Sequence, residues 1–215
     1  MRNPLTENEM HLRSLVEMFA PCTWEQFKAA AKRALPQLSE REILEGMKTL
    51  YQSKQGFFLS DNIVRLSPYD AQAGPDFTAV RSRAVWTAIA YLTPETYPHM
   101  YRIFDRGADP VCYYSFMHIR RFSNDDGTET TVKIDYDIVS VKQDDVALAN
   151  HYVSVVCRDR FAEHRRFVYC LSSFEEAEKY IMPQGHKCYF AVVTGNEVSD
   201  DLEPPVAFFE WGLES

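Results

Sequence analysis

The first 66 residues contain three segments that each begin with a residue suited to capping a helix, and the first two are each followed by a proline. Thr6 and Thr23 precede segments that end at about residues 19 and 35. In both, apolar residues recur mostly every three or four positions, which is the spacing of a helix with one buried side. Pro21 and Pro36 end these segments because proline lacks an amide hydrogen.

The third segment begins with Ser39-Glu40-Arg41-Glu42, a capping box in which the Ser39 hydroxyl and the Glu42 carboxylate each accept the other residue's amide hydrogen. Behind it, apolar residues at helical spacing predict a buried stripe of Ile43, Leu44, Met47, Leu50 and Tyr51. The link formed by residues 36–38 is about as short as a helix-turn-helix requires.

Two short apolar runs follow, at residues 57–59 and 63–66, around the polar turn Ser60-Asp61-Asn62. Such runs predict a β-hairpin. Three helices followed by a hairpin is the order of a winged helix-turn-helix, which we predict for residues 1–70. An unrelated helical bundle followed by a hairpin is the alternative.

The turn-rich residues 67–75 predict a boundary, with a second domain over residues 76–215. Apolar patterning there predicts strands at 110–122, 130–141, 166–171 and 188–194, and helices at 77–92, 146–156 and 174–182, the first capped by Asp76. Residues 166–194 would form a βαβ unit. We therefore expect an α+β protein, with an N-terminal winged helix-turn-helix before a mixed-sheet α/β domain. The aromatic segment 207–211 is expected to dock on the sheet or on a partner.

The formal net charge of −8 is unevenly distributed. Residues 1–70 carry nine Lys or Arg and nine Asp or Glu, so the whole acidic excess lies beyond them. Non-specific attraction to phosphate favours a more basic chain. The chain has no apolar run long enough to cross a membrane, no signal-like start, and five cysteines without a CxxC pair. These features predict a cytoplasmic protein without a disulfide framework.

Winged helices usually place the third helix in the major groove of DNA and the hairpin against its backbone. The solvent side of this third helix should display Arg41, Glu42, Glu45, Lys48, Thr49 and Gln52. Our candidate DNA-binding residues are Arg41, Lys48, Thr49, Gln52, Lys54 and Arg65. Each phosphate contact would add about 0.9 to the salt slope of binding. The carboxylates of Glu42 and Glu45 would oppose the binding of DNA.

Lys133, Asp135 and Asp137 lie two residues apart in a predicted strand and therefore share one face. Two interpretations are open: a divalent-metal site of a nuclease, or a solvated face opposite a buried row of Val132, Ile134, Tyr136 and Ile138. The basic pair Arg120-Arg121 and the cluster at 158–166 have acids close by, so surface solvation accounts for them. Phosphate-binding loops, HExxH and GxSxG are absent, and no cofactor or metal is expected.

The order of elements along most of the chain resembles the replication-relaxation proteins of mobile elements, in which a winged helix precedes a domain similar to the PD-(D/E)xK nuclease fold. It is also similar to an uncharacterised family from anaerobic gut Firmicutes. Pro75-Asp76 matches the PD dipeptide, but no E-x-K follows, and Lys133-Ile134-Asp135 runs in the reverse order. The resemblance therefore implies a nuclease-like domain that lacks the catalytic motif.

From the sequence, the leading hypothesis is a non-enzymatic, DNA-associated regulator or accessory protein of a mobile element. Its winged helix would bind double-stranded DNA, and its acidic domain would form a homodimer or bind a protein partner. A Mg²⁺-dependent nuclease that uses Asp135 and Asp137 is one alternative. A protein whose two domains only bind other proteins is the second.

Overall fold

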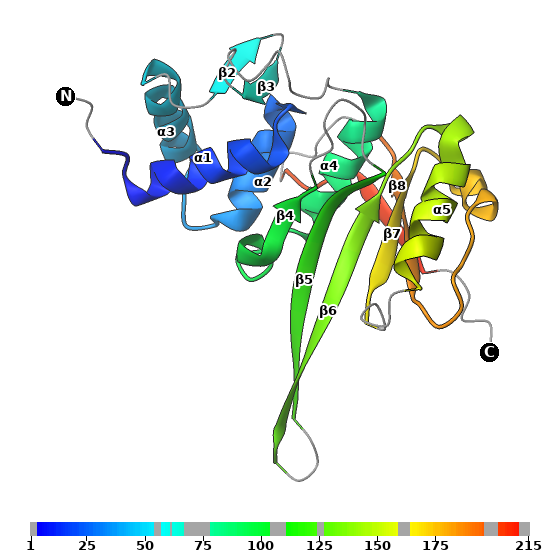
Figure 1. Cartoon of the computed structure of the whole chain (residues 1–215). Coiled ribbons are helices and arrows are strands. Elements are labelled where there is room, and N and C mark those ends of the chain that lie inside the picture. Colours follow the sequence, from blue (N-terminus) through cyan, green and yellow to red (C-terminus); the bar gives the residue numbers. More distant parts are fainter. Residues whose placement is uncertain are drawn as a thin grey trace.

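The structure is a computed structural model that describes residues 4–53, 57–60, 62–66, 78–103, 111–123, 127–158, 164–195 and 202–210. It has an α+β fold, in which a helical N-terminal part lies against a six-stranded mixed sheet (Figure 1). The predicted fold class is therefore confirmed at the level of helices and a mixed sheet.

The N-terminal part contains the three predicted helices, α1 (Glu7–Phe19), α2 (Trp24–Ala34) and α3 (Glu40–Gln52). Each begins with a full capping box, because the hydroxyls of Thr6, Thr23 and Ser39 accept the amide hydrogen of the residue three positions on. The side-chain oxygen of that residue accepts the amide hydrogen of the capping residue in return. The three predicted caps are confirmed.

The predicted hairpin is also present, as β2 (Phe57–Ser60) and β3 (Ile63–Leu66). A third, two-residue strand, β1 (Cys22–Thr23), pairs with β3 to give the order β1-β3-β2. The amide of Trp24 donates to the carbonyl of Asn62 at 2.9 Å, which fixes the start of α2 against the hairpin turn. A two-residue strand is too short to be recognised by alternation, and we did not predict it.

The main sheet has the spatial order β4-β5-β6-β7-β8-β9. Its strands are β4 (Met100–Arg102), β5 (Cys112–Ser123), β6 (Glu129–Val139), β7 (Arg166–Leu171), β8 (Cys188–Val193) and β9 (Val206–Glu210). Strands β6, β7 and β8 are parallel, and the other neighbours are antiparallel. The pairing of β9 with β8 confirms that the aromatic segment docks on the sheet, as far as Glu210.

Helices cover both faces of this sheet. Helix α4 (Ala79–Tyr91) and the N-terminal part share one hydrophobic cluster with one face, and α5 (Val146–Val156) and the 3-10 helix η3 (Phe174–Lys179) pack on the other. Parallel strands β6 and β7 are thus joined through α5, and β7 and β8 through η3.

Two predicted helices differ in detail from the structure. Helix α4 is capped by Thr78 rather than Asp76, because the Thr78 hydroxyl accepts the amide of Arg81 at 3.1 Å. The helix expected at 174–182 is the shorter η3, and Ser173 makes no capping hydrogen bond. The Glu176 carboxylate instead accepts hydrogen bonds from Ser172 at the end of β7.

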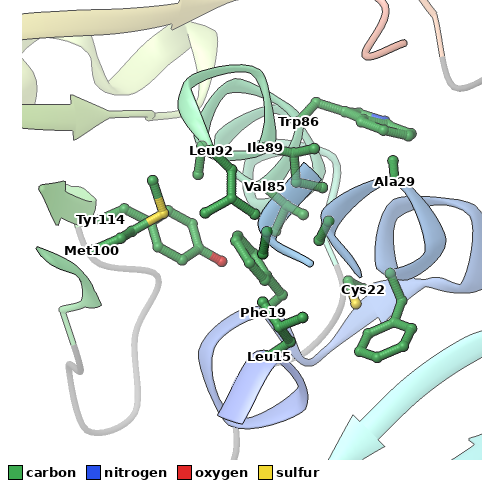
Figure 2. Packing of buried hydrophobic residues seen from close by; sticks show 14 of the residues in the cluster. Leu15, Phe19, Cys22, Ala29, Val85, Trp86, Ile89, Leu92, Met100 and Tyr114 are labelled. Carbon is green, nitrogen blue, oxygen red and sulfur yellow. The ribbon is translucent and has the colours of Figure 1, made fainter. Parts of the chain in front are cut away.

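The N-terminal part and α4 share a continuous core (Figure 2). Phe19 of α1 packs against Tyr114 of β5 with ring centroids 5.6 Å apart, and Trp86 of α4 is almost fully buried in the same cluster. Buried Arg81 donates from Nη2 to the carbonyl of Ala20 at 2.8 Å. The predicted boundary at 67–75 lies outside the described residues, so the division into residues 1–70 and 76–215 stays a prediction.

Among the described residues, no helix has both the length and the apolar character needed to cross a membrane. All five cysteines are free thiols, and only Cys157 is partly exposed.

Candidate nucleic-acid interface

Helix α3 turns one side to the core and the other to solvent. Ile43, Met47 and Leu50 are buried in the cluster that contains α1. The opposite side exposes all six residues that the sequence predicted there: Arg41, Glu42, Glu45, Lys48, Thr49 and Gln52. The prediction of an exposed polar face on α3 is therefore confirmed.

Most charges on this face are already paired. The Nε of Arg41 donates to the Glu45 carboxylate at 2.8 Å. The Glu42 carboxylate accepts from the amide and hydroxyl of Ser39, and these bonds lower the pKa of Glu42. Lys48 makes no ion pair within the described part of the chain. Lys48 is thus the cation of α3 most readily available to a phosphate.

The hairpin contributes one described candidate. Arg65 lies on β3 beside the fully buried Val64, so strand alternation directs its side chain away from the core. Thr49 and Gln52 are exposed on α3, and the Thr49 hydroxyl donates to the carbonyl of Glu45 at 3.2 Å. Lys54 lies outside the described residues.

An apolar groove of about 470 Å³ runs beside the polar face of α3. It is lined by Trp24, Leu44, Met47, Lys48, Tyr51, Gln52 and Leu59. Leu44 and Tyr51 are 41% and 56% exposed, so the prediction that they belong to the buried stripe was wrong. They lie at the edge of the apolar arc of α3, where helical spacing alone does not distinguish core from surface.

The second candidate cluster surrounds Asp137 of β6. Asp137 is fully buried, and its carboxylate accepts hydrogen bonds from Ser115 Oγ at 2.8 Å, Tyr152 OH at 3.0 Å and Arg165 Nη1 at 2.9 Å. Asp135 is half-exposed, with its carboxylate 4.0 Å from Arg165 Nη2. In the opposite row, Ile134, Tyr136 and Ile138 are buried as predicted, whereas Val132 is only half-buried. The expectation of a solvated face holds for Asp135 and is wrong for Asp137.

This arrangement fits a structural role for Asp137 better than a metal site. Both carboxylate oxygens are engaged by protein donors, and the Arg165 guanidinium takes the place of a cation. Burial raises the pKa of Tyr152, which remains a donor, and burial raises the pKa of neighbouring Cys112 to about 12. Within the described residues, no three His, Cys, Asp or Glu side chains gather as metal ligands.

The partners of Asp137 escaped sequence reasoning because they come from three distant segments, β5, α5 and the loop before β7. No spacing in the sequence connects residues 115, 137, 152 and 165.

Comparison with protein-family models, with curated proteins and with solved structures finds no match to this chain.

Proposed function

We propose that this protein is a non-enzymatic, DNA-associated regulator or accessory protein whose N-terminal part is a winged helix-turn-helix that binds double-stranded DNA through α3. The observation that carries the proposal is the exposed polar face of α3 beside the β2–β3 hairpin, with α1 packed behind it. In winged helices, this helix and this hairpin are the elements that contact DNA.

The charges predict a modest, salt-sensitive affinity. Lys48 and Arg65 are available to phosphates, whereas Arg41 must exchange its Glu45 partner for one. With about 0.9 per phosphate contact, two or three contacts give a salt slope of about 2 to 3. Thr49 and Gln52 are uncharged and fit hydrogen bonding to base edges or phosphates.

The test is the binding of a fluorescein-labelled mixed-sequence duplex, measured by anisotropy across a salt series. The variant Arg41→Ala/Lys48→Ala should lower the slope by up to about 1.8. Lys142→Ala is the matched control, because Lys142 is an exposed cation in the C-terminal part, just before α5. The absence of salt-dependent binding at low ionic strength, or an equal loss in the Lys142 variant, would exclude this function.

The groove beside α3 favours a second candidate, the docking of another protein. Leu44, Tyr51 and Leu59 are each more than 40% exposed and lie together, as the central residues of protein interfaces do before a partner covers them. A second copy of this chain is the first partner to test. Light scattering should then show a dimer that Tyr51→Glu abolishes, whereas a monomer at high concentration rules the second copy out.

A further inference from the structure

Strands β5 and β6 extend beyond their neighbours in the sheet. Strand β4 pairs with β5 only as far as Phe116, and β7 pairs with β6 only from Tyr136. Among the described strands, residues 117–123 and 129–135 therefore pair only with each other, and they form a two-stranded arm that projects from the body (Figure 1).

Strand alternation sorts the side chains of this arm between its two faces. Phe116 faces α4, since its ring lies 4.9 Å from that of Tyr91 at the end of α4. His118, Arg120 and Phe122 follow at two-residue steps and therefore lie on the same side, beyond the end of the helix. Arg121 points to the opposite side, which also carries the acids Glu129, Asp135 and Asp137 of β6.

The same face continues across the sheet with an arginine between two tyrosines. Arg166 of β7 lies 5.5 Å from the ring centre of Tyr136 and 6.0 Å from that of Tyr189. Its Nη1 donates to both hydroxyls, at 3.0 and 2.9 Å. Among the described residues, Arg166 has no carboxylate partner. The guanidinium is thus held between the two tyrosines as a cation without a carboxylate partner.

Acids are nearly absent from this face. The one described acid on its strands is Glu210, which pairs with Lys187 at 3.6 Å. At the edge of β5 where β4 no longer pairs with it, a cavity of about 370 Å³ is lined by Glu95 and Thr96 and by residues of both faces of the arm, Met117, His118, Ile119 and Arg121. Because Glu95 lies in the same cavity as His118, the positive charge of the surface comes from Arg120 and Arg166 rather than from His118.

Exposed aromatic rings flank these two arginines. Phe122 on the arm is 47% exposed, and Phe208 on β9 is 42% exposed, with its ring against Tyr91. Tyr189 is half-buried between them. Exposed rings interleaved with arginines are the combination that binds single-stranded nucleic acid, because bases stack on the rings and phosphates pair with the cations.

We infer that this sheet face, formed by His118, Arg120, Phe122, Arg166, Tyr189 and Phe208, binds single-stranded nucleic acid without strong sequence preference. A duplex fits this surface poorly, because its bases are stacked on each other and cannot reach the rings. The site is separate from α3, so the inference does not depend on the proposed function.

The experiment uses the full chain and a fluorescein-labelled thymidine oligonucleotide of about 20 residues, which exceeds the span of a typical single-strand site. Phe122→Ala should weaken binding about tenfold, the loss of one stacked base. Arg120→Ala should lower the salt slope by about 0.7, the loss of one single-strand phosphate contact.

Arg121→Ala is the matched control, because it removes the same charge from the next residue but from the opposite face. It should leave binding unchanged. Lys48→Ala should also leave binding of the oligonucleotide unchanged while weakening binding of a duplex. Failure of the α3 proposal and failure of this one are therefore separable.

Three results would overturn the inference. The wild-type chain could fail to bind the oligonucleotide at low salt, or Arg120→Ala and Arg121→Ala could have equal effects. Poly-L-glutamate could also displace the oligonucleotide at an equal concentration of charge. That last result would show that the face binds acidic chains, including acidic proteins, through charge alone, because a polymer without rings cannot stack.

Discussion

Helix α3 and the β5–β6 arm both carry acids and bases within a few residues of one another, yet the two elements arrange those charges differently. On α3, Arg41 and Glu45 are four residues apart, share one face and pair at 2.8 Å. On the arm, Arg120 and Arg121 are adjacent in sequence and lie on opposite faces. A helix thus brings opposite charges together where they neutralise each other, whereas a strand separates neighbours and leaves one face basic.

Asp135 and Asp137 extend this comparison within a single strand, because they share a face but differ in burial. We expect Asp137→Asn to lower the free energy of unfolding by about 3 kcal/mol, since the change leaves Arg165 beside a buried neutral group. Asp135→Asn should cost less than about 1 kcal/mol, because Asp135 is half-exposed and 4.0 Å from Arg165. Urea denaturation of both variants measures the difference.

Equal effects of the two substitutions would show that the carboxylate of Asp137 is not buried as described. A Mg²⁺-dependent cleavage of DNA that Asp135→Asn abolishes would favour the nuclease alternative over the non-enzymatic one, since this variant keeps the fold.

On the helix, the corresponding acid is Glu42, which belongs to the capping box of α3. Ser39→Ala should lower the free energy of unfolding by about 1 kcal/mol, because it removes the hydroxyl that accepts the Glu42 amide hydrogen. Hydrogen bonds from Ser39 lower the pKa of Glu42 from its ordinary value of 4.5. The stabilisation from Glu42 is therefore present above pH 4.5 and is lost as the pH falls through the lowered pKa.

Glu42→Gln separates the stabilisation that comes from the Ser39 hydroxyl from the stabilisation that comes from the charge of the Glu42 carboxylate. Glutamine at this position completes a capping box, as Gln26 does in α2, so the variant should retain most of its stability at pH 7. Unfolding curves between pH 3 and pH 7 should then be flatter for Glu42→Gln than for the wild type. Curves of equal slope would contradict the assigned pKa shift.

Local chemistry accounts for what the sequence predicted correctly. The caps at Thr6, Thr23 and Ser39 depend on residues three positions apart, and strands β5 to β8 depend on the apolar character of each segment, with alternation in β6. Strands β1 and β4 have two and three residues, too few to show a period. Short elements become strands only because a neighbour pairs with them.

The candidate sites were harder to predict because they depend on tertiary contacts. Arg120-Arg121 is visible in the sequence as a basic pair, but only the register of β5 against β6 and the end of α4 show which arginine lies on the aromatic face. Arg166 joins that face through Tyr136 and Tyr189, which lie 30 residues before it and 23 after it. Leu44 and Tyr51 have the spacing of core residues and remain exposed.

The smallest expected effect concerns the pair that neutralises α3. Glu45→Gln should lower the free energy of unfolding by only about 0.4 kcal/mol, because the Arg41–Glu45 pair is solvent-exposed. The same change frees Arg41 and removes an acid, so the salt slope of duplex binding should rise by up to about 0.9, depending on how far Arg41 leaves Glu45 in the wild type. Glu17→Gln is a matched control, since Arg13 and Glu17 form an equivalent pair at 2.9 Å on α1. It should cost the same stability without changing duplex binding, and a rise in both variants would mean that net charge, rather than the face of α3, governs the interaction.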